Sequence, residues 1–416
     1  MAKKLVKQLA ISPSLYAFIC LKLLQCAHNQ QIRIPMYQLS FSLEQFITEF
    51  WQKKPTIIKG GFSNFQDPIS PDELAGLTME EEIDSRFVSN LNGDWHAEHG
   101  PFKEEKFAEL GESNWSFIVQ AANHWHPEAA KLTAPFDAAL PNWLMDDLMI
   151  SYSVPGGGVG PHIDQYDVFI IQGVGKRHWR VGAKDEGQYV ETCRHAALRQ
   201  IEGFDPIIDN VLEPGDILYI PPGFPHDGYA LEPSMSYSVG YRSPKEQELI
   251  SNFADFVLAH DLGDEHLHNP DQTPQNKTGL IQTQDANLLE GMLSKALEDQ
   301  NFVDKFIGCL LSQSRHQLDV VAPEEAWDCE EVHNHLMSGG IFERVTGLRA
   351  YYHQNNHCTA YINGEVVEVT PEQEAFIYAL CDSKTVDFQA IESVEDVTSV
   401  VTILTELINK GYWFSE

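Results

Sequence analysis

The central part of the chain, from about residue 143 to residue 243, alternates apolar and polar positions with the two-residue period of β-strands. The segments Asp147 to Val154 and Ser234 to Arg242 show this alternation, and glycine and proline turns separate the segments. The turn Gly173-Val174-Gly175 predicts a short hairpin between the strands on either side of it. Because many short strands follow one another without intervening helices, the pattern predicts a β-sandwich or a jelly-roll barrel.

Helical periodicity flanks this β-rich part. Before it, Ser42 is a suitable N-cap for a helix. The apolar residues of that helix share one face, and they are Leu43, Phe46, Ile47, Phe50 and Trp51. After the β-rich part, residues 246–262 and 285–318 have helical spacing, and the polar segment 264–287 predicts a loop.

The C-terminal segment, 337–416, predicts a small winged-helix-like module. Short strands come first, and helices start at Thr370 and near Val394, the second ending before Gly411. Residues 365–416 carry eleven acidic residues against two lysines. Because DNA binding requires a basic surface, we expect no direct DNA binding by this module.

The overall charge limits the partners further. The formal net charge is −33 at pH 7, which argues against a nucleic-acid partner and favours a basic protein. The seven cysteines are odd in number and form no Cys-x-x-Cys pair. They therefore predict reduced thiols and a cytoplasmic location.

The first 35 residues differ from the rest because they carry five Lys or Arg residues and no acidic residue. A basic start before an apolar stretch is also typical of a cleaved signal. Pro13 and Lys22 interrupt that stretch, and no run of 18 apolar residues predicts a membrane helix. We expect residues 1–35 to be a poorly ordered extension that precedes the natural start at Met36.

A candidate metal site lies at the head of one predicted strand. His162 and Asp164 are two positions apart, so their side chains project to the same face. A third ligand must come from another strand, and His226, which follows three prolines, is the best candidate. Two histidines and one carboxylate form the facial triad of non-haem Fe(II) oxygenases. The alternative is a surface hydrogen-bonded pair of His162 with Asp164.

Arg177 provides a clue to a co-substrate. It shares a strand face with Trp179 and Val181, so its guanidinium points into the barrel. A buried charge without a partner costs several kcal/mol, so the guanidinium requires an anion. The distal carboxylate of 2-oxoglutarate would be such an anion. The alternative is a salt bridge between Arg177 and an internal acidic residue.

The neighbouring strand and loop predict further contacts. Asp147, Met149 and Ser151 share one face, and Tyr166 continues the face of His162 and Asp164. If these faces point inward, Ser151 could hydrogen-bond the co-substrate, and Asp147 with Tyr166 could hold a cationic substrate side chain. The alternative is that Asp147 caps a turn. Neither a P-loop nor a Gly-x-Ser-x-Gly elbow accompanies these residues.

Two long segments carry a resemblance to a known family. They are "DDLMISYSVPGGGVGPHIDQYDVFIIQGVGKRHWRVG" and "LEPGDILYIPPGFPHDGYALE". With "FWQKKPTIIKGGF", "DPISPDELAGL" and "GYWF", they closely resemble the bacterial ribosomal oxygenases of the JmjC/cupin superfamily, in particular the arginine hydroxylases that act on large-subunit ribosomal protein sixteen. The similarity runs from about Met36 to the end of the chain.

The resemblance implies an α+β chain with a double-stranded β-helix (jelly-roll) core. It implies a JmjC/cupin catalytic domain over 36–244, a helical dimerisation region over 245–336 and a winged-helix-like domain over 337–416. The expected partners are a basic ribosomal protein of the large subunit, as substrate, and a second copy of the chain.

The resemblance also implies roles for individual residues. His162, Asp164 and His226 would bind Fe(II), and Arg177 and Ser151 would bind 2-oxoglutarate. Contacts to the substrate arginine would come from Asp147, Met149 and Tyr166. The implied reaction uses dioxygen to hydroxylate the β-carbon of an arginine. An N-methyl demethylase with the same iron chemistry and a non-catalytic binding module are the two competing hypotheses.

Overall fold

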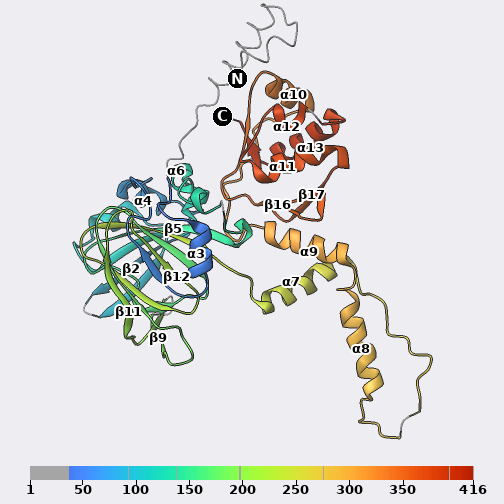
Figure 1. Cartoon of the computed structure of the whole chain (residues 1–416), viewed down its shortest axis with the longest axis horizontal. Helices are drawn as coiled ribbons and strands as arrows, with labels where there is room; N and C mark the ends of the chain where they lie inside the picture. Colours follow the sequence, from blue (N-terminus) through green and yellow to red (C-terminus); the bar gives the residue numbers. More distant parts are fainter. Residues whose placement is uncertain are drawn as a thin grey trace, which may run out of the picture.

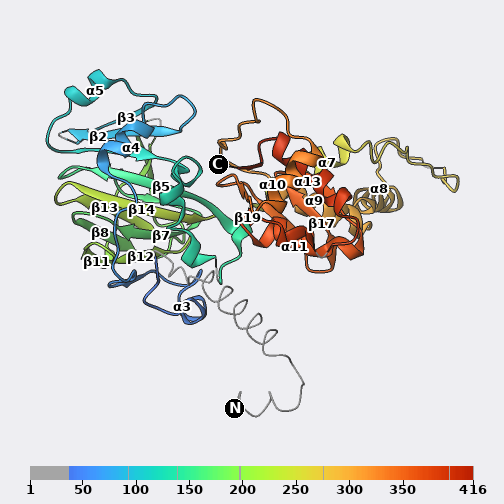
Figure 2. The ribbon, with the colours of Figure 1, turned by 90° about the horizontal axis from the view of Figure 1, so that it is seen from above.

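The computed structural model describes residues 37–415 except Asn92, Ala138, Ala196, Ala197, Gln275 and Ser393. The extension expected at residues 1–35 lies outside the described residues. A β-barrel, a helical segment and a C-terminal domain follow one another along the chain, and the barrel and the C-terminal domain lie side by side (Figures 1 and 2). Within the described residues, no helix has both the length and the apolar character needed to cross a membrane.

The barrel consists of two antiparallel sheets. The larger sheet has the strand order β1 (Thr56–Ile58), β12 (Ile217–Ile220), β7 (Asp167–Gln172), β14 (Ser234–Tyr241), β5 (Met145–Ser153), β4 (Trp115–Val119), β2 (Ser85–Leu91) and β3 (Asp94–His99). The smaller sheet has the order β11 (Pro206–Leu212), β8 (Arg177–Gly182), β13 (Pro225–Ala230) and β6 (His162–Ile163). Consecutive strands thus alternate between the sheets: the larger sheet contains β5, β7, β12 and β14, and the smaller sheet contains β6, β8, β11 and β13. This alternation confirms the expected jelly-roll core.

The expected hairpin at Gly173-Val174-Gly175 is wrong. The strands on either side of this turn, β7 and β8, belong to different sheets, so the turn connects the two layers of the barrel. Every residue of β7 is buried because the strand pairs with β12 on one side and β14 on the other. Gly175 has φ +78°, and a Cβ there would lie 2.2 Å from Pro233 O. The turn therefore needs glycine, although it closes no hairpin.

Helices cover the outer face of the larger sheet. The predicted helix after Ser42 is α3 (Leu43–Glu49), and the Ser42 side chain accepts a hydrogen bond from Gln45 N. Phe46 of α3 packs on Tyr219 and Phe169 with ring centroids 4.7 Å and 5.1 Å apart. The other short helices of this part are α4 (Pro71–Leu77), η1 (Ala122–His124), α5 (Glu104–Ala108), α6 (Pro127–Ala130), η2 (Ala134–Phe136) and η3 (Asn142–Leu144). The apolar core thus lies on the outer face of this sheet, and its inner face remains available for polar residues.

Three helices follow the barrel, namely α7 (Glu246–Ala259), α8 (Thr283–Lys295) and α9 (Gln300–Ser312). They extend away from the barrel, and α8 with the long loop before it stands apart from both folded parts (Figure 1). This arrangement leaves large apolar side chains on the surface, since Leu258 is 72% exposed and Leu293 is 80% exposed.

The C-terminal domain has its own core around Phe342, Phe376, Leu404 and Trp413. Its helices are α10 (Cys329–Met337), η4 (Pro371–Gln373), α11 (Glu374–Asp382), α12 (Gln389–Glu392) and α13 (Val397–Asn409). Its strands are β15 (Phe342–Arg344), β16 (Ala350–His353), β17 (Asn356–Ile362), β18 (Glu365–Glu368), β19 (Thr385–Val386) and β20 (Trp413–Phe414). The sequence reading missed α10, although the Asp328 and Glu331 capping box marks its start.

Candidate active site

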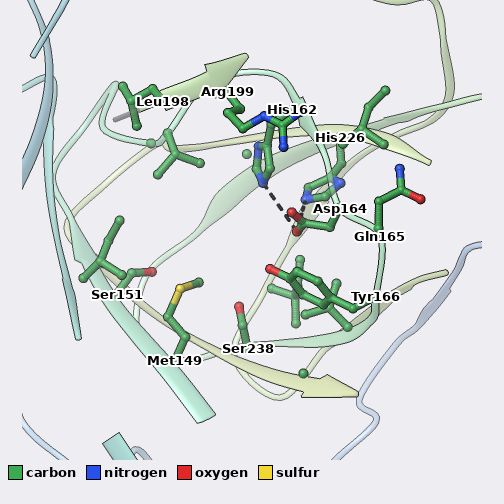
Figure 3. Close-up of a pocket in the computed structure, with 18 of the residues that line it drawn as sticks. Met149, Ser151, His162, Asp164, Gln165, Tyr166, Leu198, Arg199, His226 and Ser238 are labelled. Atoms are coloured by element: carbon green, nitrogen blue, oxygen red, sulfur yellow. Dashed lines mark ion pairs between the residues drawn. The ribbon is translucent and has the colours of Figure 1, made fainter. Parts of the chain in front are cut away.

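His162, Asp164 and His226 meet at one end of the smaller sheet. His226 on β13 pairs directly with His162 on β6, and Asp164 follows in the bend after β6. The Nε2 atom of each histidine lies 3.6 Å from Asp164 Oδ2 (Figure 3). The ligand atoms of all three residues lie within 4.8 Å of one another.

Backbone carbonyls fix the orientation of both imidazole rings. His162 Nδ1 donates to Gly160 O at 2.9 Å, and His226 Nδ1 donates to Phe224 O at 3.1 Å. A carbonyl oxygen can only accept, so the proton of each neutral ring is on Nδ1. In the neutral form of each ring, Nε2 therefore presents its lone pair toward Asp164, as a metal-binding histidine requires.

Burial and charge set the protonation of these groups. Burial, with a smaller contribution from nearby His162, lowers the pKa of His226 to about 4, so this ring is neutral at pH 7. Burial alone would raise the pKa of Asp164, but the two imidazoles and a hydrogen bond from Tyr166 hold it well below its usual value. The site therefore combines a carboxylate with a neutral imidazole at neutral pH.

This donor set fits a divalent transition-metal ion. Ligands at about 2.1 Å from one metal, in adjacent octahedral positions, lie about 3 Å apart. The 3.6 Å separations of the two Nε2 atoms from Asp164 Oδ2 need only a small contraction to reach that geometry. Two nitrogen ligands and one oxygen ligand leave three coordination positions for other molecules.

Arg177 lies on β8 with its side chain directed inward, and the residue is only 5% exposed. Its guanidinium donates to Ser234 Oγ (2.9 Å), Ser151 Oγ (2.9 Å), Ser151 O (2.9 Å) and Ser234 O (3.0 Å). Among the residues that the structure describes, it forms no ion pair with an acidic side chain. Burial lowers its pKa to about 9, so it remains charged at pH 7. An anionic ligand would therefore find an uncompensated cation here.

All eight residues singled out from the sequence line one cavity of about 990 Å³. Asp147 is buried and accepts hydrogen bonds from Gln120 Nε2 (2.6 Å) and Ala121 N (2.9 Å). Asp147 thus fixes the backbone at Ala121 and also lines the cavity. The structure is therefore compatible with both interpretations from the sequence, a contact to a cationic substrate side chain and the capping of a turn. Burial raises the pKa of Asp147 and that of Tyr166, the second well above its usual value.

Met149 and Ser151 continue the same wall of the cavity. Met149 packs against the cluster that contains Val88, Ile118 and Leu198. The Ser151 hydroxyl lies beside the Arg177 guanidinium, and its residue is directly opposite Ser236 on β14. Both residues therefore line the same wall of the cavity, where Met149 makes apolar contacts and Ser151 makes a polar contact.

Two features of the site were missed from the sequence. Ser234 holds Arg177 together with Ser151, and its signal is the alternation of serines at 234, 236 and 238. The hairpin of β9 (Glu191–His195) and β10 (Leu198–Ile201) contributes to the wall of the cavity. Gln200 Nε2 of this hairpin donates to Val159 O at 2.6 Å and so fixes the loop that leads to His162.

Comparisons with known proteins agree with this geometry. A JmjC domain is matched over residues 131–249, and a ROXA-like winged helix is matched over residues 295–414. The ribosomal protein uL16 3-hydroxylase of Escherichia coli is 47% identical over 380 residues, which is 91% of this chain and 99% of that protein.

Solved structures extend the comparison. The X-ray structure of E. coli YcfD has 47% sequence identity and a TM-score of 0.87, and the match covers 91% of this chain and 100% of that one. A structure of YcfD, a ribosomal oxygenase from E. coli, in complex with cobalt and 2-oxoglutarate has 46% identity and a TM-score of 0.83 over 91% of this chain and 99% of that one. The chain belongs to the JmjC-domain ribosomal oxygenases.

Proposed function

We propose that this protein is an Fe(II)- and 2-oxoglutarate-dependent hydroxylase that modifies an arginine of the large-subunit ribosomal protein uL16. The observation that carries the proposal is the grouping of His162, Asp164 and His226 in the same cavity as a buried arginine that has no acidic partner among the described residues. The E. coli relative that is named a uL16 3-hydroxylase supports the choice of substrate.

In this proposal the two ends of the co-substrate have different partners. His162, Asp164 and His226 hold the iron, and Arg177 with Ser151 holds the distal carboxylate of 2-oxoglutarate. When bound, Fe(II) and 2-oxoglutarate supply the oxidising chemistry, which consumes dioxygen and releases succinate and carbon dioxide. The contribution of the protein is placement, because a reacting carbon that is misplaced by about 1 Å can cost about a hundredfold in rate.

Asp147, Met149 and Tyr166 form the proposed arginine-binding wall. The Asp147 carboxylate keeps one oxygen committed to Gln120 and Ala121, and its charge is suited to a guanidinium. Met149 offers an apolar surface for the aliphatic part of an arginine, and Tyr166 contacts Asp164 and so lies beside the proposed metal site. The net charge of −33 would attract a basic ribosomal protein in the cytoplasm.

The test is an assay with purified protein, Fe(II), 2-oxoglutarate and a recombinant uL16 fragment. We expect succinate to form and the fragment to gain one oxygen atom on an arginine, as measured by mass spectrometry. Loss of a methyl group from a methylated fragment would identify a demethylase instead. Absence of succinate, together with normal ligand binding by an Arg177→Ala variant, would identify a non-catalytic binding protein.

We also infer that two copies associate through the helical segment. The support is the row of apolar side chains that α7 and α8 leave exposed, which includes Ile250, Leu258, Leu289 and Leu293. Burial of such residues is worth about 1.5 kcal/mol or more each. Sedimentation equilibrium tests this, and we expect a dimer for the native chain and a monomer for an Ile250→Lys, Leu293→Lys double variant. A native chain that sediments as a monomer refutes the inference.

A further inference from the structure

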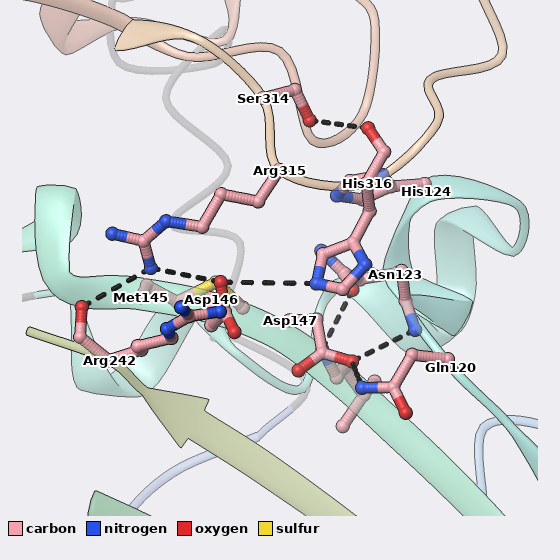
Figure 4. Close-up of polar contacts among 12 residues, drawn as sticks. Gln120, Asn123, His124, Met145, Asp146, Asp147, Arg242, Ser314, Arg315 and His316 are labelled. Atoms are coloured by element: carbon pink, nitrogen blue, oxygen red, sulfur yellow. Dashed lines mark hydrogen bonds and ion pairs between the residues drawn. The ribbon is translucent and has the colours of Figure 1, made fainter. Parts of the chain in front are cut away.

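The C-terminal half of the chain reaches the wall of the active-site cavity. Arg349 Nη2 donates to Met145 O at 2.6 Å. Arg315 Nη1 donates to Asp146 Oδ1 at 3.0 Å and to Arg242 O at 3.2 Å (Figure 4). These residues follow α9 or precede β16, so they come from the segment matched as a winged helix. These side chains contact the first two residues of β5, Met145 and Asp146, and the residue that follows β14, Arg242.

His316 completes this contact region. Its Nε2 atom lies 3.9 Å from Asp146 Oδ1, which is too long for a hydrogen bond, and it has no hydrogen-bond partner among the described residues. One ligand-type atom from each of Asp146, Asp147 and His316 lies within 4.8 Å of the others. His316 therefore faces both carboxylates at the start of β5.

The segment that carries Arg315 and His316 is itself fixed. Ser314 Oγ donates to His316 O at 2.7 Å, and His124 Nδ1 donates to Gln317 O at 2.8 Å. The two imidazole rings of His124 and His316 lie edge to face with centroids 6.1 Å apart. Hydrogen bonds thus fix the segment of residues 314–317, as they fix the Asp147 carboxylate in the barrel.

A metal ion is not the occupant that this cluster favours. Arg315 already neutralises Asp146, and the Arg349 guanidinium lies on the backbone of the same residue. Two guanidinium groups beside two carboxylates leave little net charge to attract a cation. The arrangement instead connects the C-terminal domain to the residue that precedes Asp147.

We propose that Arg315 and His316 are positioning residues for substrate binding, which act through Asp146 to set the place of Asp147 in the cavity. The inference rests on the proposed function of Asp147 as the guanidinium-binding residue. Asp146 and Asp147 are consecutive on β5, so a shift of the first moves the backbone of the second. Gln120 and Ala121 hold the Asp147 carboxylate, and the ion pair of Arg315 with Asp146 adds a contact at the start of β5, where the pairing with β14 is irregular between Val239 and Tyr241.

The consequence is that the C-terminal domain forms part of the substrate end of the catalytic site. The co-substrate end is independent of it, because Arg177, Ser151 and Ser234 contact one another within the barrel. The effect of removing Arg315 or His316 should therefore fall on the protein substrate and spare 2-oxoglutarate.

The experiment uses the full chain with Arg315→Ala and His316→Ala, singly. We expect the KM for a uL16 fragment to rise about tenfold, because its guanidinium partner is misplaced, with the KM for 2-oxoglutarate unchanged. Calorimetric titration of the fragment into protein loaded with Zn(II) and 2-oxoglutarate should show the same weakening without turnover. Arg315→Lys, which keeps a cation near Asp146, should recover part of the loss.

His353→Ala is the matched control, since the His353 ring donates to Asp304 O within the C-terminal half, away from this contact. A fragment affinity that stays within twofold of the native value in both Arg315→Ala and His316→Ala overturns the inference. So does an equal weakening in His353→Ala, because it would reflect general destabilisation. If the native protein releases succinate but neither binds nor modifies the fragment, the proposed substrate is wrong instead.

Discussion

His226 lies directly opposite His162 in the antiparallel pairing of β13 with β6, and their ring centroids are 4.2 Å apart. This register places the two Nε2 atoms at the same distance from Asp164 Oδ2. Because both rings are fixed through Nδ1 by carbonyls of their own segments, little rearrangement is needed for metal binding. The sheet therefore holds the two histidines in place, and Asp164 follows directly after the end of β6.

We predict that Asp164→Ala abolishes hydroxylation by preventing metal retention. Removal of the carboxylate from the proposed triad should weaken metal binding by more than about a hundredfold, since even outer contacts to metal ligands can cost that much. The measurement is the metal content of dialysed protein by mass spectrometry. Asp227→Asn is a control in the same strand region, and equal metal retention by Asp164→Ala and the native protein would contradict the assignment.

We predict that Arg177→Ala weakens 2-oxoglutarate binding by about 1.5–3 kcal/mol, the usual range for hydrogen bonds to charged groups. The guanidinium is buried and donates to the hydroxyls of Ser151 and Ser234, so alanine would remove a charge that the surrounding structure holds in place. Arg177→Lys should lose less, since it keeps the charge but not the two-pronged geometry. Calorimetry in the presence of Mn(II) measures this, and an unchanged affinity in Arg177→Ala would place the carboxylate elsewhere.

The sequence predicted that the proposed metal and co-substrate residues share one cavity, because these residues follow the period of a strand. His162 and Asp164 are two apart, and the inward face of β8 is marked by Arg177, Trp179 and Val181, all of them buried. The alternation of side chains along a strand was enough to predict which of them point into the barrel. The two-residue rule also placed Asp147, Met149 and Ser151 on the cavity wall.

Strand partners and contacts between distant segments were not available from such patterns. The turn after β7 has the composition of a hairpin, yet β7 pairs with β12 and β14, because a buried strand needs backbone hydrogen-bond partners along both of its edges. The contact of His316 with Asp146 joins residues 170 positions apart. No local periodicity reports a pairing of that kind, because it depends on how two domains pack.

We predict that Gly160→Ala lowers both stability and activity. Gly160 has φ +79°, and a Cβ there would lie 2.3 Å from Gln200 Nε2 and 2.8 Å from the Trp95 ring. The left-handed backbone alone should cost about 1–3 kcal/mol, and the clash should displace the carbonyl that orients His162. Urea denaturation and metal affinity are the two measurements.

Gly93→Ala is the control for this variant, because Gly93 has φ +86° but a Cβ there would contact nothing within 4 Å. We expect it to lose a similar amount of stability and to keep the metal affinity of the native protein. If Gly160→Ala also keeps that affinity, the close approach of Gln200 does not hold the metal site in place.

The contact between the barrel and the C-terminal domain should depend on pH in two opposite ways. Asp146 and Asp147 raise the pKa of His316, while burial and the Arg349 guanidinium oppose this shift. The protonated His316 ring therefore contributes fully to the free energy of unfolding below about pH 6.5, the pKa of a histidine in the unfolded chain. This contribution is lost as the pH rises through the higher pKa of His316 in the folded protein. Burial lowers the pKa of His124 to about 4, with smaller effects from His316 and Arg349.

The contribution of His124 has the opposite sign. It is complete above about pH 6.5 and is lost toward pH 4, by up to about 3 kcal/mol, because only the unfolded chain binds the proton readily. We predict that His316→Gln flattens the loss of thermal stability above pH 6.5 and that His124→Gln flattens the loss below it. Thermal unfolding measured from about pH 4.5 to about pH 8.5, a range that contains the unfolded pKa of about 6.5, tests both predictions. Identical profiles for the native chain and His316→Gln would show that the imidazole stays neutral beside Asp146.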